Sequence, residues 1–312
     1  MNGKYLNADK LSGEYISAME RQLGLWGREG QMRLNEARVA VAGLGGIGSA
    51  SALMLAKAGV GAIRVCDWDY YDSANIVGQE FATHVDIARP KYEVALEVMS
   101  KHTKHSQLEG FQADLKQEDV CERLVADVSI LVSAVDNAHA RIALGRAADK
   151  AGIPFVVCTN IGWTATHTVF FSDSLSYKHA WNVKGIKCFE DGYPDMNDPD
   201  TALAIKQEWD IWVAVFSRFT PAAMRQFIER DSGSYWYASP PAYFAASLGV
   251  NDVLKIITGS GEPTVYPKSI YYDLLNNRHW EWNTLIKQYN ALRQVWSKGP
   301  EAVLSVLGDL QL

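Results

Sequence analysis

The 312-residue sequence lacks several features that mark other classes of protein. No apolar run reaches about 18 residues, so no membrane-spanning helix is predicted, and residues 1–7 carry no apolar signal core. Positive charge is not in excess, because the net charge is −6, and this gives no indication of a nucleic-acid partner. The four cysteines form no C-x-x-C pair, which argues against a disulfide scaffold or a four-cysteine zinc site. We therefore expect a cytoplasmic protein that binds neither membrane nor nucleic acid.

Apolar residues are plentiful, at 48% of the chain, and their spacing alternates between two periods. Strand-like and helix-like segments follow one another through the first half of the chain. The predicted strands are 38–43, 62–67, 108–111, 128–134 and 153–158, and the predicted helices between them are 46–58, 90–102, 117–126 and 138–151. Such alternation predicts an α/β fold with a Rossmann-like, doubly wound and mostly parallel sheet.

The second half of the chain predicts an added antiparallel part. A further strand is expected at 166–171, and the segments 269–273 and 278–282 predict a hairpin around two asparagines. The stretch 172–200 is a long irregular loop, and such loops are typically functional or mobile. The predicted organisation is an N-terminal helical arm (1–36), a nucleotide-binding core (37–171), a crossover loop and helical insert (172–230), and a C-terminal helix and hairpin completing the same domain (231–312).

A glycine-rich turn, Gly43-Leu-Gly45-Gly46-Ile-Gly48, joins the first predicted strand to the next helix. Glycines let the backbone turn tightly and approach a phosphate, and the start of the helix offers unpaired N–H groups. Asp67 ends the second strand about 20 residues further on, where a carboxylate can accept hydrogen bonds from ribose hydroxyls. The pattern predicts a nucleotide site, but it does not distinguish a dinucleotide from ATP.

Other polar residues follow the same strands. Asp69 lies two residues after Asp67, Asp136 and Asn137 follow the fourth strand, and Lys91 opens a helix. Ligands of open α/β sheets bind outside the carboxyl ends of the strands. Because a lysine can screen triphosphate charge and an aspartate can hold magnesium, this set favours ATP with Mg²⁺.

In their order along the chain, these motifs resemble the adenylating domain of the ubiquitin-activating family, whose bacterial members are of the ThiF, MoeB and HesA type. The matching elements are Arg21-Gln22 with Trp26-Gly27, the glycine turn, Asp67-x-Asp69, Asn75 with Gln79, Lys91, and Asp136-Asn137 with Arg141. A similar C-terminal run at 239–259 extends the resemblance to roughly residues 18–283.

The resemblance implies an ATP-dependent adenylyltransferase that activates a carboxylate as an acyl-adenylate and releases pyrophosphate. The carboxylate would be the C-terminus of a ubiquitin-like protein or peptide, or a small-molecule acid. The resemblance assigns cofactor binding to Gly43, Gly45, Gly46, Gly48, Asp67, Asp69, Asn75, Gln79, Lys91 and Asn137, magnesium to Asp136, and catalysis to Arg21, Lys91 and Asp136. Arg21 would reach the active site of the other subunit, in a homodimer or in a pair with a related subunit.

The chain also departs from the family's pattern. Gly78 stands before Gln79 where the family usually has arginine, so one phosphate-binding cation is missing. The missing zinc-binding C-x-x-C pairs and the unusual segment 172–230 suggest a specialised biosynthetic member. Two alternatives remain open. One is a non-catalytic partner subunit, which Gly78 favours; the other is a nicotinamide-dependent oxidoreductase, which Lys91 and Asp136 disfavour.

Cys188 lies in the long loop, where thioester-forming relatives place a catalytic cysteine. The neighbouring Lys187 could lower its pKa and so favour the reactive thiolate. The alternative is an incidental loop cysteine, so Cys188 is a candidate nucleophile only.

Overall fold

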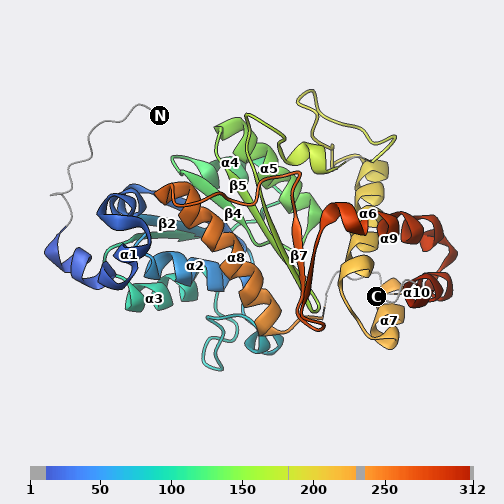
Figure 1. Ribbon diagram of the computed structural model, residues 1–312, viewed down its shortest axis with the longest axis horizontal. Coiled ribbons are helices and arrows are strands. Elements are labelled where there is room, and N and C mark those ends of the chain that lie inside the picture. Colours follow the sequence, from blue (N-terminus) through green and yellow to red (C-terminus); the bar gives the residue numbers. More distant parts are fainter. Residues whose placement is uncertain (1–11, 182, 230–235, 310–312) are drawn as a thin grey trace.

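One eight-stranded sheet with helices on both faces forms the centre of the molecule, as the computed structural model in Figure 1 shows. The structure describes residues 12–181, 183–229 and 236–309. The strands are β1 (Arg38–Ala42), β2 (Ala62–Cys66), β3 (Gln107–Phe111), β4 (Ile130–Ser133), β5 (Phe155–Ile161), β6 (Thr164–Phe170), β7 (Ile270–Asp273) and β8 (Arg278–Glu281).

The strand order is β3-β2-β1-β4-β5-β6-β7-β8, and it confirms the predicted fold class. The first five strands in this order are parallel, and β6, β7 and β8 are antiparallel to their neighbours. Val41 of β1 lies beside Val65 on one side and Val132 on the other. Because the chain reverses its direction of winding between β1 and β4, a crevice forms at their carboxyl ends.

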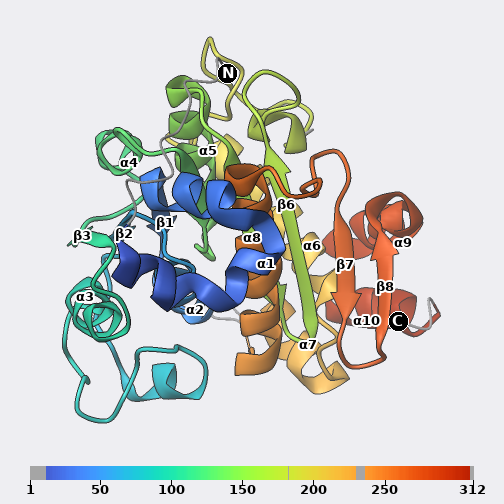
Figure 2. The same cartoon turned by 60° about the vertical axis from the view of Figure 1, so that its left-hand side comes forward.

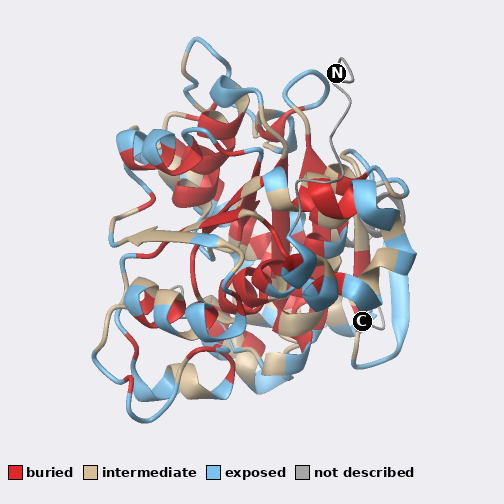
Figure 3. Ribbon diagram, turned by 90° about the vertical axis from the view of Figure 1, so that its left-hand side faces the viewer, coloured by how far each residue is buried: buried red, intermediate tan, exposed pale blue. Residues whose placement is uncertain are grey.

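Helices form two layers around this sheet. They are α1 (Gly13–Glu36), α2 (Gly46–Lys57), α3 (Lys91–His102), α4 (Glu118–Val125), α5 (Ala138–Ala151), α6 (Pro199–Phe216), α7 (Pro221–Glu229), α8 (Ser239–Thr258), α9 (Trp282–Val295) and α10 (Pro300–Asp309). In Figure 2, α2, α3 and α8 lie on one face and α4 and α5 on the other. The strands and the inward sides of these helices are buried, whereas the outer sides are exposed (Figure 3).

Local signals explain why the predicted elements form where they do. The Val-Ala-Val-Ala run of β1 is buried on both faces, as is typical of a central parallel strand. Helix α5 begins at Asn137, whose side chain accepts the N–H of Ala140, and ends before Gly152 in the left-handed conformation. These end signals confirm the helix predicted at 138–151.

Helix α1 bends at Gly27, whose φ of 68° and ψ of 178° are not helical. Its first half packs at the far end of α2, where the Tyr15 hydroxyl donates to the carbonyl of Gly59 at 2.7 Å. Gln22 Nε2 donates to the carbonyl of Ala58 at 2.9 Å. The predicted N-terminal arm is therefore anchored to the core, although its residues 1–11 lie outside the described part.

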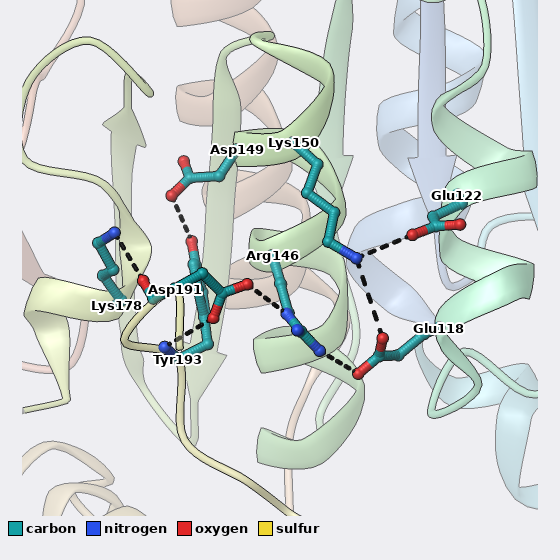
Figure 4. A network of polar contacts seen from close by, with 8 residues as sticks. All are labelled: Glu118, Glu122, Arg146, Asp149, Lys150, Lys178, Asp191 and Tyr193. Atoms are coloured by element: carbon teal, nitrogen blue, oxygen red, sulfur yellow. Dashed lines mark hydrogen bonds and ion pairs between the residues drawn. The ribbon is translucent and has the colours of Figure 1, made fainter. Parts of the chain in front are cut away.

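Polar contacts join the long loop after β6 to α5, and α5 in turn to α4, as Figure 4 shows. Arg146 Nε donates to Asp191 Oδ2 at 2.6 Å, and the same guanidinium pairs with Glu118. Tyr193 is buried, and its hydroxyl donates to Asp149 Oδ2 at 2.9 Å. The loop is thus held by side chains of the core and does not stand free.

A third apolar core joins α6, α7, α9 and α10 to the β7–β8 hairpin, at the edge opposite α3 (Figure 1). A buried ion pair, Arg218 Nε to Asp273 Oδ2 at 2.9 Å, links the end of α6 to this hairpin. The hairpin turn contains Asn277 with a φ of 54°, which confirms the predicted turn. No helix among the described residues has the length and apolar character needed to cross a membrane.

Candidate functional site

The glycine turn between β1 and α2 has the close geometry that the sequence predicts. Gly43 has a φ of 87°, and Gly45 is the N-cap of α2. A side chain at Gly48 would overlap the carbonyl oxygen of Gly43, so the turn closes only with glycine there. The first N–H groups of α2 therefore lie at the crevice without helical partners, and they form an anion-binding end.

Asp67 is joined directly to this turn. Leu44 N–H donates to Asp67 Oδ2 at 2.6 Å, and Asp69 N–H donates to Oδ1 at 2.8 Å. Asp67 is only 7% exposed. Burial raises the pKa of the Asp67 carboxyl, although the charge of Lys91 and the two N–H donors act in the opposite direction. The structure thus brings the predicted ribose ligand and the predicted phosphate turn together.

The raised pKa of Asp67 predicts acid-sensitive nucleotide binding. A carboxylate accepts hydrogen bonds from ribose hydroxyls, whereas its protonated form accepts them less well. Because the pKa lies above the ordinary carboxyl value, protonation begins at a higher pH, and ATP affinity should fall as the pH drops. Calorimetric titration with ATP between about pH 8 and about pH 5 measures this effect. Asp67→Asn is the control, and an equal pH dependence in that variant would contradict the assignment.

Lys91 is a buried cation beside the same carboxylates. Its Nζ lies 3.0 Å from Asp69 Oδ2, and its side chain is 5% exposed whereas that of Asp69 is 49% exposed. The ammonium also lies 5.8 Å from the centre of the Tyr71 ring. A buried lysine next to a half-exposed aspartate can exchange that partner for a phosphate without being desolvated again.

Asn75 and Gln79 differ in how free their side chains are. Oδ1 of the Asn75 side chain accepts the N–H of Asp72 at 3.3 Å, in a capping box at the start of the 3₁₀ helix Ser73–Val77. Gln79 is 9% exposed, and its Oε1 has no hydrogen-bond partner among the described residues. Its Nε2 lies 3.9 Å from the position of a Cβ at Gly45. Gln79 is thus available at the glycine turn, while part of Asn75 is used for local capping.

Asp136 and Asn137 follow β4 at the other side of the turn. A Cβ at Gly43 would lie 3.1 Å from the carbonyl oxygen of Ala134, so the end of β4 adjoins the glycine turn. Asn137 caps α5, since its Oδ1 accepts the N–H of Ala140 at 3.1 Å. Asp136 is exposed and makes no hydrogen bond or ion pair with the described residues.

The donor set at this edge fits a magnesium ion that arrives with a nucleotide. No group of three or more His, Cys, Asp or Glu side chains in the described part could hold a metal ion. Asp136 supplies one free carboxylate, and Mg²⁺ in proteins is commonly bound by one or two carboxylates together with substrate phosphates and water. The residues therefore suit Mg²⁺ with a triphosphate, and they do not form a resident metal site.

Arg21 lies away from the site of its own chain. It is exposed on α1, and the next residue, Gln22, bonds to the carbonyl of Ala58 just past the last turn of α2. The glycine turn is at the other end of α2, about 18 Å away at 1.5 Å per residue. One chain by itself therefore does not bring Arg21 to Asp67 or Asp136.

Cys188 is also distant from the glycine turn. It is exposed in the packed loop, and the adjacent Phe189 lies under Arg146, 3.9 Å from the guanidinium carbon to the ring centre. Arg146 is about 12 Å along α5 from its first residue. The ammonium of Lys187 pairs with Asp198, which raises the pKa of Lys187.

Two further residues complete the surroundings of the site. Arg141 is buried, and it donates to Thr159 Oγ1 at 3.0 Å and to the carbonyl of Val135, so it holds the end of β4 in place. Tyr237 contacts the start of α2, far from it in the sequence. No periodicity or spacing in the sequence points to Tyr237, because it reaches the site only through the fold.

A family model described as the ThiF family matches residues 19–292. The sulfur carrier protein ThiS adenylyltransferase of Bacillus subtilis is 36% identical over 138 residues, which are 44% of this chain and 41% of that protein. The probable adenylyltransferase/sulfurtransferase MoeZ of Mycobacterium tuberculosis is 30% identical over 270 residues, covering 86% of this chain and 60% of that protein. The chain thus spans less than two thirds of these curated relatives. The crystal structure of Escherichia coli MccB with ATP has a TM-score of 0.63 at 20% identity, covering 87% of this chain and 73% of that one.

Proposed function

The chain belongs to the ThiF family, and on this premise we propose that it is an ATP-dependent adenylyltransferase that activates a carboxylate. The observation that carries the proposal is that the glycine turn, the end of β2 and the end of β4 lie next to one another. The N–H of Leu44 in the glycine turn bonds to buried Asp67, and the free carboxylate of Asp136 follows the adjacent strand. A nucleotide held by its ribose and phosphates would present its α-phosphate near the crevice between β1 and β4.

The proposed reaction forms one bond and breaks one. An oxygen of the acceptor carboxylate attacks the α-phosphorus, and the bond from that phosphorus to the bridging oxygen breaks, so pyrophosphate leaves. The free N–H groups of α2 and the ammonium of Lys91 would stabilise the phosphate charge. Asp136 would hold Mg²⁺, which neutralises charge on the leaving phosphates when it is bound.

The acceptor that we propose is a carboxylate on a small protein or peptide, with a small-molecule acid as the alternative. The support is the name of one relative, which acts on the sulfur carrier protein ThiS, and the structure of MccB in complex with N-formylated MccA. We further propose that the protein works in the cytoplasm, as a homodimer or with a related subunit. The position of Arg21 supports a dimer, because only another chain could bring it to the site.

A second candidate function is a non-catalytic partner subunit, and one observation favours it. Gly78 provides no cation next to Gln79. Buried Lys91 and free Asp136 oppose this candidate, because a subunit without catalytic activity has no need for a desolvated cation at a phosphate site.

The first test is nucleotide selectivity. We expect calorimetry to detect Mg²⁺-dependent binding of ATP and no comparable binding of NAD, because the site combines a ribose ligand with charge for phosphates. Exchange of labelled pyrophosphate into ATP, with small acceptors of the kind that relatives use, such as ThiS or MccA, would distinguish the enzyme from the partner subunit. Tight NAD binding without a response to ATP would contradict the proposal.

Cys188 is expected to be dispensable for adenylation. A thiolate attacks an acyl-adenylate readily because AMP is a good leaving group, but Cys188 lies beside the middle of α5 and not at the glycine turn. Cys188→Ala should therefore retain pyrophosphate exchange and overall turnover. The measurement is intact-protein mass spectrometry after incubation with ATP and acceptor. A hydroxylamine-sensitive adduct present on the wild type and missing from Cys188→Ala would show instead a two-step thioester pathway.

A further inference from the structure

An aromatic side chain packs directly against Gly78 and limits which residue fits at this position. The φ of Gly78 is −158°, which lies outside the left-handed region that favours glycine. A Cβ at this position, however, would overlap Cε2 of Tyr237 and lie 3.2 Å from Cζ of the same ring. Carbon atoms pack at about 3.5–4.0 Å. The ring of Tyr237 thus occupies the space that a side chain at position 78 would need.

The same ring edge lies against the first residue of α2. A Cβ at Gly46 would be 3.2 Å from Cε2 of Tyr237 and 2.7 Å from the carbonyl oxygen of Gly78. This is the helix end with unpaired N–H groups. Gln79, the residue after Gly78, is buried there with an Oε1 that lacks a partner among the described residues. The ring therefore borders the start of α2, where the N–H groups and the side chain of Gln79 are available to bind a ligand.

Backbone contacts at Tyr237 and just after it hold the residue in position. It forms a bridge with Gly162 in the β5–β6 turn, and Ala238 after it is the N-cap of α8. The carbonyl of Ser217 accepts the N–H of Trp163 at 3.1 Å in the same turn. Ser217 and Tyr237 are thus both attached near the carboxyl end of β5, and in the described part of this segment Tyr237 contacts the glycine turn.

We propose that Tyr237 is a positioning residue of the nucleotide site, whose ring forms the wall beside the phosphate-binding end of α2. The inference rests on the proposed function, and it adds Tyr237 to the site as the residue whose ring fills the space beside Gly78. An aromatic wall excludes water from one side of the N–H groups. Charge interactions strengthen where water is excluded, so the neutral ring strengthens phosphate binding by the N–H groups, although position 78 itself supplies no cation.

The test measures binding of Mg²⁺–ATP and of adenosine to the full chain by calorimetry, and it needs no acceptor. Tyr237→Ala should raise the Kd for ATP by about tenfold or more, which is about 1.4 kcal/mol. The affinity for adenosine, which has no phosphates, should change little. Tyr237→Phe keeps the ring and should bind ATP like the wild type. Tyr272→Ala is the matched control, because that half-buried tyrosine packs on Phe244 and His279, away from the turn.

Gly78→Ala tests the contact from the other side. The added carbon displaces the ring, so the Kd for ATP should rise, whereas in Gly78→Ala with Tyr237→Ala it should be no higher than in Tyr237→Ala alone. Melting temperatures establish that each variant folds, and Gly78→Ala carries the test if Tyr237→Ala does not. A wild type that binds no ATP overturns the proposed function. A wild type that binds ATP, with folded variants that bind it equally well or lose adenosine to the same degree, overturns the role of Tyr237 alone.

Discussion

Replacing Asp136 by alanine is expected to lower acceptor-dependent exchange of pyrophosphate into ATP by about 10²- to 10³-fold. The carboxylate follows β4 beside the glycine turn, and it is exposed without a partner among the described residues. Its removal should lower the melting temperature only slightly, because its one electrostatic effect on the described residues is to favour the charge of buried Arg141. What is lost is the carboxylate that we assign to the magnesium ion accompanying the triphosphate.

The magnesium dependence of ATP binding separates this role from a general disturbance. Calorimetry with and without Mg²⁺ should show that the metal strengthens ATP binding to the wild type but not to Asp136→Ala. Asp173→Ala is a matched control, since Asp173 is an exposed aspartate in the loop after β6. Full exchange activity in Asp136→Ala, or an equal magnesium effect in both proteins, would remove Asp136 from the mechanism.

Mixing two inactive variants, Arg21→Ala and Asp136→Ala, is expected to restore activity. If Arg21 serves the partner's site, each mixed dimer contains one site with both groups and one site with neither. Random exchange of equal amounts makes about half of the dimers mixed, so about a quarter of all sites regain activity in a two-fold symmetric dimer. Each variant alone should be nearly inactive, because an arginine that stabilises phosphate charge from another chain contributes about 10³-fold or more.

Subunit exchange has to be demonstrated independently, for example by mass spectrometry of a tagged and an untagged chain. The matched control is Arg28→Ala mixed with Asp136→Ala, since Arg28 is exposed on the same helix beyond the bend at Gly27. Arg28→Ala alone should be as active as the wild type. The activity of its mixture with Asp136→Ala should therefore equal the average of the two variants, with no gain from mixing. If the subunits exchange but the Arg21 mixture does not regain activity, Arg21 acts in the site of its own chain or in neither site.

The family and the fold class were predictable from the sequence because their signals are local. The alternation of strand and helix periods predicted β1 to β5 and α2 to α5 to within a few residues. The glycines at the start of α2 and the acids after β2 and β4 needed only the rule that parallel strands end at one edge of a sheet. The structure then places the N–H of Leu44 on Asp67 and Lys91 beside Asp69, while the chemical roles of these residues stay predictions.

Other features could not be obtained from any window of sequence. The long loop looked free in the sequence, yet Arg146 and Tyr193 fasten it to α5, and this packing carries Cys188 away from the glycine turn. The bend of α1 at Gly27 places Gln31 in a buried hydrogen-bonded cluster. Side chains that meet in this way come from separate elements, and their meeting depends on how the sheet and its layers close.

Position 78 shows the division between sequence and structure most clearly. The sequence by itself determined that no cation stands there, just as it determined the nucleotide turn, since both are matters of residue type and short spacing. Only the tertiary structure decided what fills the space, because Tyr237 arrives from the end of a segment that leaves the sheet after β6 and returns at the β5–β6 turn. Local patterns specify the elements through backbone hydrogen bonding and burial, whereas a contact between distant segments exists only once those elements have packed.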